Sequence, residues 1–364
     1  MAVGKRPAAA AAAAVVIGGQ AVKKRRVVVA KRTRPNRSTS TITIKKPAAA
    51  YATTADYEDE ETPWTRIGEG AFGVVYKARH RATGQTVAIK FPAVSSLPPD
   101  LACYAPDPRE QLLREARLLE AACSDGNPHV VAFHCVVRDP DNGDLGIVME
   151  FVAGQSLRDI LEERRADSTA PPPIPEATVR SFMRQLLTGA KGVQERNIVH
   201  RDIKPANVLV AEAGQVLKIC DFGLAISTSD PPPHSEAGTM YYTAPEVLMG
   251  KPDPDASADA WSLGCVMAEL VGGEILMQRA GVDAALLHFQ KYYGEEIAYL
   301  WTIFGLLGTP DDVTWPGFAS LPRAAKMPPL KLGQRSRLGE LFPEETLSDE
   351  GFEVDFSPAT PTRG

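Results

Sequence analysis

The first half of the chain alternates apolar and polar residues in short runs, a pattern that predicts β-strands. These runs lie at residues 66–67, 74–78, 85–91, 130–137 and 146–151. Between the third and the fourth run, residues 109–122 carry Leu112, Ala116 and Leu119 at the spacing of one helix face. Residues 65–151 are therefore predicted to form a small sheet with one inserted helix.

Helical spacing dominates after Gly154. Apolar residues recur every three or four positions within residues 157–163, 175–196, 258–271 and 297–307. The stretch from Ala258 to Val271 is strongly apolar, which predicts a buried helix. No internal repeat is visible. The fold class predicted from this order is α+β, with a small sheet followed by a mainly helical region.

The first 60 residues lack sustained periodicity and are rich in Ala, Lys, Arg, Ser and Thr, so we expect residues 1–60 to be a disordered basic tail. Residues 1–50 hold twelve Lys or Arg and no acidic residue, which leaves 28 basic and 45 acidic residues in the rest of the chain. A body this acidic argues against nucleic-acid binding apart from non-specific contacts of the tail.

Two basic clusters in the tail bear on localisation: residues 23–26 and residues 31–34. They are typical of a nuclear import signal or a non-specific nucleic-acid arm, although short basic runs are also common in solvated tails without a receptor. The tail is acid-free and contains Ser and Thr at positions 38–43, so a plastid or mitochondrial transit peptide is the alternative. We expect the nucleus, the cytoplasm or both, with a plastid or mitochondrion as the alternative.

The five cysteines are scattered, and no pair has C-x-x-C spacing. This pattern suggests neither a disulfide framework nor a zinc site, and it fits reduced thiols. No stretch approaches the ~20 apolar residues that a membrane-spanning helix needs. We therefore expect no membrane partner.

A glycine-rich turn joins the first two predicted strands. Residues 68–75 read G-x-G-x-x-G-x-V, and a strand rather than a helix follows the last glycine. This order differs from a dinucleotide-binding fingerprint and fits a hairpin lying over phosphates, while an ordinary glycine-rich hairpin turn is the alternative. The candidate nucleotide contacts in this hairpin are Ile67, Gly68, Glu69, Gly70, Ala71, Phe72, Gly73, Val74 and Val75.

Lys90 ends the strand beside this hairpin, where its ammonium would reach the phosphates of a bound nucleotide. Such a lysine needs a carboxylate to hold it, and Glu115 on the predicted helix is the favoured partner over Glu120. A solvated surface pair is the alternative reading of a lone Lys–Glu pairing.

The segment HRDIKPAN at residues 200–207 and the DFG at residues 221–223 carry the strongest chemical signal. Asp202 is the candidate catalytic base, and Lys204 is a compact cation suited to a moving phosphoryl group. Asn207 and Asp221 supply oxygens of the kind that Mg²⁺ prefers. A solvated charged loop would not need these residue types in this order, and we therefore expect phosphoryl transfer from ATP with Mg²⁺.

These motifs, with APE at residues 244–246, resemble those of a eukaryotic protein kinase from about Thr65 to about Phe352. The resemblance implies a two-lobed domain over residues 61–352, with lobes at 61–152 and 153–352 and a disordered tail at 353–364. Lys204 is similar to the lysine of serine/threonine kinases, which implies protein substrates. Glu150 and Val152 match the adenine-binding hinge.

Within that family, the chain most resembles cyclin-dependent kinases of the CMGC group, through residues 68–79, 261–265 and 307–317. Asp259 matches the buried helix aspartate that anchors the catalytic loop. The helix at 108–115 lacks the PSTAIRE-like sequence that contacts a cyclin, which leaves a cyclin partner open. Ala71 and Phe72 replace a phosphorylated Thr-Tyr pair, so that inhibitory brake is predicted to be absent.

The activation segment departs from the same pattern. His234 stands where the activating threonine is expected, and the adjacent Ser235 is the substitute, with Thr239 and Glu246 further along the segment. A phosphate on Ser235 would recruit Arg201. Thr243 replaces an arginine that shapes the pocket for proline after the target residue, which argues against proline-directed specificity.

We expect the C-lobe to end short of its last two helices, which would leave Glu246 as a buried carboxylate without its arginine partner and weaken the lobe. Three functions follow in order of preference: an active Ser/Thr kinase, a catalytically impaired kinase-like scaffold or regulatory binding protein, and a nucleic-acid-binding adaptor. The complete set of catalytic side chains favours the enzyme.

Overall fold

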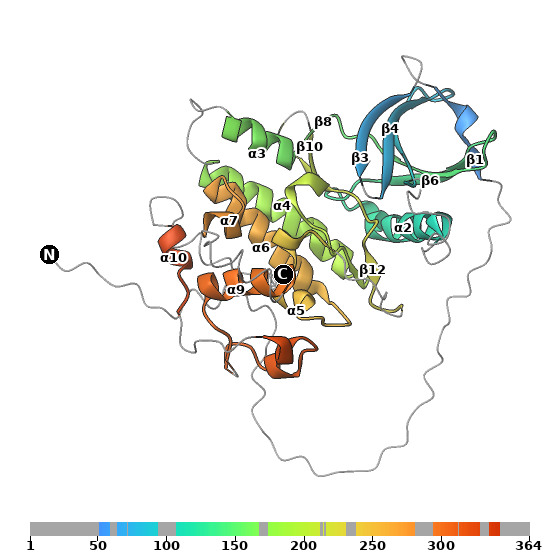
Figure 1. Cartoon of the computed structure of the whole chain (residues 1–364). Helices are drawn as coiled ribbons and strands as arrows, with labels where there is room; N and C mark the ends of the chain where they lie inside the picture. The colour runs from blue at the N-terminus through green and yellow to red at the C-terminus, as the bar shows by residue number, and fades with distance from the viewer. Residues whose placement is uncertain are drawn as a thin grey trace, which may run out of the picture.

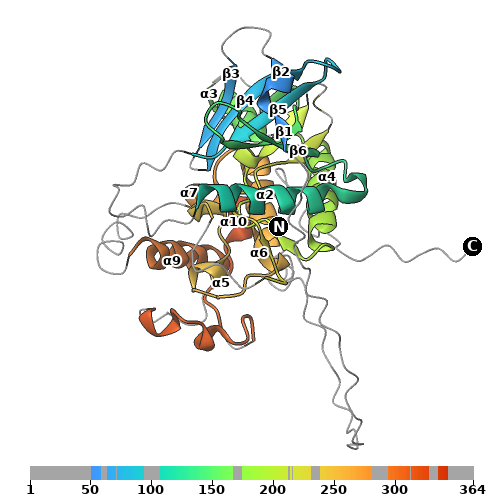
Figure 2. The same ribbon diagram turned by 90° about the vertical axis from the view of Figure 1, so that its right-hand side faces the viewer.

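The computed structural model describes residues 51–58, 64–70, 72–93, 107–166, 174–211, 214, 216–230, 238–280, 294–311, 313–327 and 335–342. These residues form a β-rich lobe and a helical lobe, with helix α2 (Pro108–Cys123) lying under the sheet and against the helical lobe (Figures 1 and 2). Among them, no helix is both long and apolar enough to cross a membrane.

The β-rich lobe is built on one seven-stranded sheet in the order β1-β6-β7-β5-β4-β2, with β3 paired to β4. Every neighbouring pair is antiparallel except β1 with β6, which is parallel. The strands are β1 (Ala52–Thr53), β2 (Tyr57–Glu58), β3 (Thr65–Gly70), β4 (Gly73–His80), β5 (Thr86–Phe91), β6 (Phe133–Arg138) and β7 (Leu145–Glu150). The sheet with its one inserted helix is as predicted, although β6 begins at Phe133 rather than at residue 130.

The predicted boundary of the tail at residue 60 is wrong. Strands β1 and β2 lie within residues 51–58, and they pair with β6 and β4. Tyr57 is buried against Ala78, Val87 and Val148 in a small apolar cluster on the sheet. Strand pairing and the burial of Tyr57 hold this segment in place. Hydropathy averaged over a longer window reveals neither of these two contributions. Residues 1–50 and 343–364 lie outside the described residues.

Helix α2 begins and ends with identifiable signals. The Asp107 side chain accepts a hydrogen bond from the Arg109 N–H at 2.8 Å, and Pro108 occupies the first helical position. Leu112, Ala116 and Leu119 are buried, as their spacing predicts. The helix therefore presents one apolar face to the sheet and places Glu115 on the same buried side.

The helical lobe is organised around α4 (Glu176–Gln194) and α6 (Ala256–Gly272), which pack against each other (Figure 1). The other helices are α3 (Leu157–Ala166), α5 (Pro245–Leu248), α7 (Leu276–Arg279), α9 (Glu295–Leu307) and α10 (Leu338–Leu341). A single large apolar core runs from α2 through α4 and α6 to α9. The core therefore extends under both lobes and joins the sheet, through α2, to the helical lobe.

Short strands carry the predicted site residues in this lobe. β8 (Gly154–Ser156), β10 (Val208–Ala211) and β11 (Leu217–Ile219) form one sheet, while β9 (Ile198–Val199) pairs with β12 (Ile226–Ser227). The 3₁₀ turn η4 (Pro205–Asn207) precedes β10, and η5 (Met240–Tyr242) precedes α5. The HRD segment thus follows β9, and the DFG segment follows β11.

Candidate active site

The glycine-rich hairpin between β3 and β4 depends on one glycine more than on the others. A Cβ on Gly73 would lie 2.0 Å from the Phe91 carbonyl oxygen, and the residue has a φ of +147°. A Cβ on Gly70 would meet nothing within 4 Å. Gly73 is therefore required by the close approach of β5, whereas Gly70 leaves open space. Ala71 lies outside the described residues.

Phe72 at the tip of this hairpin turns toward Lys90 and the DFG segment. The Lys90 ammonium lies 5.9 Å from the centroid of its ring. A Cβ on Gly223 would lie 3.1 Å from Phe72 Cγ, so the ring packs closely on the DFG segment. The hairpin thus lies over Lys90 and Gly223, as expected of a cover for phosphates.

Lys90, Glu115 and Asp221 form a buried ionic cluster, which we call the Lys90 cluster. Lys90 Nζ donates to Glu115 Oε1 and to Asp221 Oδ1, each at 2.7 Å. The side chains are 5%, 8% and 30% exposed, respectively. The pairing of Lys90 with Glu115 is confirmed, and Glu120 points to solvent. The cluster joins a strand, a helix and the DFG segment, which lie far apart in sequence.

Charge and burial act against each other in this cluster. Burial alone would lower the pKa of Lys90, but the Glu115 and Asp221 carboxylates raise it above its ordinary value. Burial would raise the pKa of Asp221, and the Lys90 ammonium brings it below the ordinary value of 3.8. For Glu115 burial prevails and raises the pKa although Lys90 is in contact. We take Lys90 and Glu115 as ionised, because the Lys90 ammonium, held by two carboxylates, stabilises the charged form of each carboxylate and is stabilised by both.

Asp202 is surrounded by hydrogen-bond donors. Its Oδ1 accepts from the Thr239 N–H at 3.1 Å and from the Thr239 hydroxyl at 2.8 Å. Its Oδ2 accepts from Asn207 Nδ2 at 2.9 Å and lies 2.7 Å from Lys204 Nζ. Lys204 Nζ also donates to the Thr239 hydroxyl at 2.6 Å. The structure therefore brings Asp202, Lys204, Asn207 and Thr239 into one network with the carboxylate at its centre.

The backbone around this network is held in the left-handed region at two non-glycine residues, Arg201 (φ 66°) and Asp221 (φ 64°). Asp259 on α6 stabilises the first turn, because its carboxylate accepts from the His200 N–H at 2.7 Å and from the Arg201 N–H at 2.9 Å. Burial raises the pKa of Asp259, while these backbone bonds favour its charged form. Strain of this kind persists where the surroundings fix the residue.

His200 connects the catalytic loop to the DFG strand, a role that its sequence position did not reveal. Its Nε2 lies 3.0 Å from the Cys220 carbonyl oxygen, and its Nδ1 lies 3.3 Å from the Asp202 N–H. A carbonyl oxygen can only accept and an N–H can only donate, so these contacts fit a ring that donates through Nε2 and accepts through Nδ1. The ring also meets Phe222 edge-on at 4.8 Å between centroids.

The activation segment holds one contradiction with the sequence-based predictions. Glu246 is half-buried rather than buried, and its Oε1 accepts a hydrogen bond from the Ser257 hydroxyl at 3.0 Å. The buried carboxylate in the neighbourhood is instead Glu269, which pairs with Arg165 and accepts from the Tyr242 hydroxyl at 2.5 Å. The segment is thus fixed to α6 through Tyr242. Ser235 and His234 lie outside the described residues.

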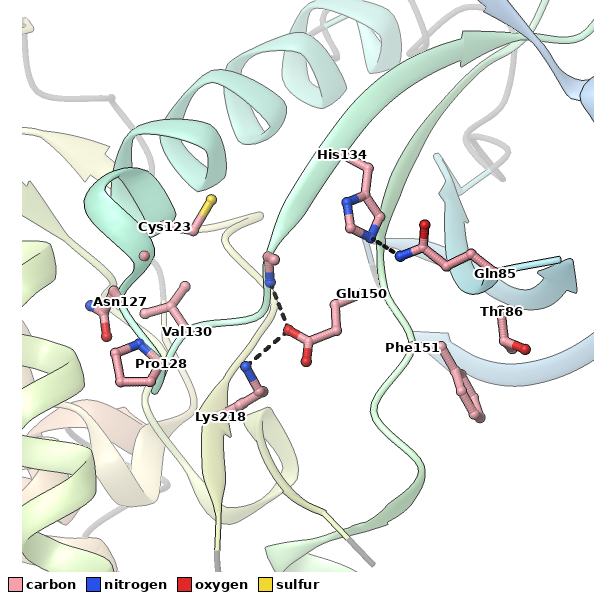
Figure 3. A pocket seen from close by; sticks show the side chains of 12 residues that line it. Gln85, Thr86, Cys123, Asn127, Pro128, Val130, His134, Glu150, Phe151 and Lys218 are labelled. Carbon is pink, nitrogen blue, oxygen red and sulfur yellow. Dashed lines mark hydrogen bonds and ion pairs between the residues drawn. The ribbon is translucent and has the colours of Figure 1, made fainter. Parts of the chain in front are cut away.

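The hinge residues differ in where their side chains point. The Glu150 side chain points toward Lys218, and its Oε2 lies 3.0 Å from Lys218 Nζ (Figure 3). Val152 is half-buried at the edge of the core and packs against it. Glu150 can therefore contribute to a nucleotide site only through its backbone.

The residues present suit a hard cation held partly by its substrate. No group of three or more His, Cys, Asp or Glu side chains that could hold a metal occurs among the described residues. Asn207 offers an amide oxygen at the end of η4, and Asp221 offers a carboxylate two residues after β11. Magnesium commonly uses one or two such ligands and takes the rest from phosphates and water.

Comparison with known proteins places this geometry in a family. A model of the protein kinase domain matches residues 62–301. A rice protein (Oryza sativa subsp. japonica) named "Putative cyclin-dependent kinase F-2" is 40% identical over 295 residues, which cover 79% of this chain and 80% of the relative. Cyclin-dependent kinase 20 of Homo sapiens is 37% identical over 262 residues, covering 71% of this chain and 66% of that protein.

A third relative is longer. Cyclin-dependent kinase G1 of Arabidopsis thaliana is 32% identical over 313 residues, and the chain spans 44% of its length. The chain therefore belongs to the protein kinase family and is a serine/threonine kinase of the cyclin-dependent-kinase-like type.

Proposed function

We propose that this kinase transfers the γ-phosphoryl group of ATP to serine or threonine hydroxyls of proteins, with Mg²⁺ as cofactor. The Lys90 cluster and the hydrogen-bonded network around Asp202 carry the reaction. The observation that supports this most is the Lys90 cluster, in which one ammonium lies 2.7 Å from both Glu115 and Asp221. Such a cation is positioned for phosphate oxygens, and the reaction depends mainly on positioning and charge neutralisation.

Asp202 is the proposed proton acceptor. The Thr239 hydroxyl already donates to Asp202 Oδ1 and accepts from Lys204, which is the arrangement that an incoming serine or threonine hydroxyl would need. Lys204 would neutralise the phosphoryl group as it moves. Asn207 donates to Asp202 and keeps the carboxylate oriented. Asp202 thus accepts the proton from the attacking hydroxyl as its oxygen bonds to the γ-phosphorus, while the bond from that phosphorus to the bridging oxygen breaks and ADP leaves.

Asn207 and Asp221 are the proposed Mg²⁺ ligands. Mg²⁺ would supply charge neutralisation at the phosphates when bound. Asp221 suits this role because the Lys90 ammonium holds its pKa low, so that the carboxylate is ionised at neutral pH. The hairpin from Ile67 to Val75, with Lys90, would cover the phosphates, and the backbone of Glu150 to Val152 would face the adenine.

A cyclin-type activator is a second proposal for the partner, besides protein substrates. Its support is the outward face of α2, where Arg109, Leu113 and Arg117 are exposed on the helix that carries Glu115. A protein bound there would hold α2 in place and so stabilise the existing contact between Glu115 and Lys90. Adding a cyclin should stimulate the wild type, and Leu113→Asp should remove the stimulation. Equal activity with and without a panel of cyclins would contradict the proposal.

A phosphate on the activation segment would find two arginines. Arg201 is half-buried, and its pKa is lowered to about 10 by burial and by the nearby Arg114. Two guanidinium groups this close attract an anion. We propose Ser235 as the modified residue, and mass spectrometry of the active enzyme together with Ser235→Ala tests it. Full activity of an unmodified enzyme would reject this step.

The nucleus is the proposed localisation, supported by the basic clusters at residues 23–26 and 31–34. A fluorescent fusion of residues 1–50 should accumulate in nuclei, and a matched fusion with alanine at residues 23–26 should do so less. Accumulation in plastids or mitochondria would replace this proposal with a transit peptide.

Radiolabelled phosphate incorporation into a generic basic protein tests the central proposal. Asp202→Asn should lower kcat by about 10³-fold, because it removes the proton acceptor while keeping the shape. Asp141→Asn, in an exposed turn, is the matched control and should leave kcat unchanged. Equal incorporation by wild type and Asp202→Asn would end the catalytic assignment.

A further inference from the structure

A pocket of about 450 Å³ lies beside the hinge, and its lining includes Glu150 and Phe151 but none of the residues of the Lys90 cluster. Four segments line it: the start of β5, the connection from α2 to β6, the end of β7, and β11 (Figure 3). Among the described residues that line it, Glu150 and Lys218 carry the opposite charges, and their side chains meet at its edge. We call this the rear pocket, and Glu150 with Lys218 the hinge pair.

The hinge pair is held in a defined geometry. Glu150 Oε2 lies 3.0 Å from Lys218 Nζ and accepts a hydrogen bond from the Ala132 N–H at 3.1 Å. The Glu150 N–H donates to the Ala132 carbonyl oxygen at 2.8 Å. The side chains are 30% and 16% exposed, so water only partly screens the charges. One carboxylate thus joins the hinge to both the α2–β6 connection and the helical lobe.

The place of Lys218 in the fold matters as well as its charge. It lies on β11, three residues before Asp221 in the chain. The same strand is bonded to the α2–β6 connection by its backbone: the Ile219 N–H donates to the His129 carbonyl at 2.8 Å, and the Val131 N–H donates to the Ile219 carbonyl at 3.0 Å. Strand β11, which ends two residues before Asp221, is therefore fixed along its length, and the hinge pair adds a side-chain link between this strand and the hinge.

We propose that Lys218 is a positioning residue for the nucleotide: through Glu150 it sets where the hinge lies relative to Asp221, and so fixes the distance between the adenine end and the phosphate end of the site. The inference rests on the proposed function, because it requires the hinge to bind adenine and Asp221 to act at the phosphates. Lys218 itself touches neither, and it acts only by holding Glu150.

This role predicts an effect on ATP binding more than on the chemical step. Without the pair, the hinge carboxylate loses its partner and the hinge gains freedom, while Asp202 and Lys204 keep their contacts. Partly exposed ion pairs correspond to effects of up to about fivefold in an equilibrium constant. Lys218→Met should therefore raise the KM for ATP about three- to fivefold and leave kcat within about twofold.

The experiment compares five proteins by steady-state kinetics with ATP as the varied substrate: wild type, Lys218→Met, Lys218→Arg, Glu150→Gln and the double variant Lys218→Met with Glu150→Gln. Glu150→Gln keeps the shape and removes the charge, so it should raise KM as Lys218→Met does. The double variant should be no worse than either single variant, because all three lose the same link. Lys218→Arg should restore KM to within about twofold of wild type.

Lys191→Met is the matched control, since Lys191 is an exposed lysine on α4 that lies 3.9 Å from Glu195, and it should leave KM unchanged. Thermal melts of all variants identify a loss of folding, which would lower the active fraction and kcat rather than KM. The inference is overturned if KM stays at the wild-type value, if the single effects multiply in the double variant, or if kcat rises when the pair is broken. A wild type that transfers no phosphate would instead overturn the proposed function and this inference with it.

Discussion

The Lys90 cluster and the hinge pair both join the β-rich lobe to the helical one, but they differ in burial and in the number of carboxylates that each ammonium contacts. Lys90 and Glu115 are 5% and 8% exposed, and the ammonium serves two carboxylates. Lys218 and Glu150 are 16% and 30% exposed, and the ammonium serves one. A buried charge that loses its partner is costly, whereas a partly exposed one is rehydrated.

This difference in burial corresponds to a difference in role: the Lys90 cluster takes part in the reaction, and the hinge pair positions the site. The Lys90 cluster puts the side chains themselves where a substrate would use them, so its residues are reactive groups with shifted pKa values. In the hinge pair the Glu150 carboxylate is bound to Lys218, so only the backbone of Glu150 is left to contact a ligand. Breaking the first should stop catalysis, and breaking the second should only loosen the site.

The largest expected effect is that of Lys90→Met. It removes the cation from the phosphate end and leaves Glu115 as an unpaired carboxylate in the core. We expect kcat/KM for ATP to fall about 10³-fold or more. Lys218→Met makes the same chemical change at the hinge pair and is the direct comparison, with an effect of about fivefold. Equal losses for the two variants would remove the distinction between the two regions.

Asp259→Ala tests the support under the catalytic loop. The carboxylate bonds to two backbone N–H groups and holds Arg201 in a left-handed conformation. Its removal leaves buried donors unsatisfied and should lower the free energy of unfolding by about 3 kcal/mol, as measured by urea denaturation. Glu246→Ala is the contrast, because this carboxylate is half-buried and bonds to one hydroxyl, and the loss should be below about 1 kcal/mol. A larger effect at Glu246 would support the prediction that Glu246 is a buried carboxylate without a partner, which the structure contradicts.

Gly73→Ala and Gly70→Ala separate two glycines of one hairpin. The first would place a methyl group 2.0 Å from the Phe91 carbonyl oxygen, so β4 and β5 must move apart. We expect a loss of about 2 kcal/mol in stability, read from thermal unfolding, together with weaker ATP binding. The second has open space and should cost less than about 1 kcal/mol. Similar melting temperatures for the two variants would contradict this account of the hairpin.

The smallest expected effect is on the stability of the folded protein at acidic pH. The pKa of Asp221 is lowered in the folded state, so its ionised form contributes stability that is present above the ordinary value of 3.8 and is lost as the pH falls through the lower folded value. Wild type should therefore lose more stability between pH 5 and pH 3 than Asp221→Asn, which cannot titrate. Parallel curves of unfolding midpoint against pH for the two proteins would show that Asp221 is not stabilised by Lys90.

Local spacing was enough to predict much of this molecule. The helix at residues 109–122 and the one at 175–196 correspond to α2 and α4 within two residues at each end. Residue type and order single out Lys90, Glu115, Asp202, Asn207 and Asp221, and the structure places Lys90, Glu115 and Asp221 in one cluster and Asp202 and Asn207 in one hydrogen-bonded network. The chemistry they need limits which residue types can occupy such positions, so the sequence carries that information directly.

Features that depend on pairing across the fold could not be predicted. Strands β1 and β2 have two residues each, too short for any periodicity, and they exist because β6 and β4 offer edges to them. The hinge pair joins positions 150 and 218, and nothing local marks either residue as a partner of the other. The burial of Glu246 was mispredicted because exposure depends on what α5 packs against, and Glu269 one helix away takes the buried position instead.

The central claim is that the Lys90 cluster forms the phosphate end of a site for MgATP. Calorimetric titration of the whole chain with ATP tests it directly, with Mg²⁺ present and with Mg²⁺ removed by chelation. We predict binding that strengthens at least tenfold with Mg²⁺ in wild type, and a Mg²⁺ effect that disappears in Asp221→Asn while the protein stays folded. A folded wild type that shows no heat of binding with ATP and saturating Mg²⁺ would contradict the claim.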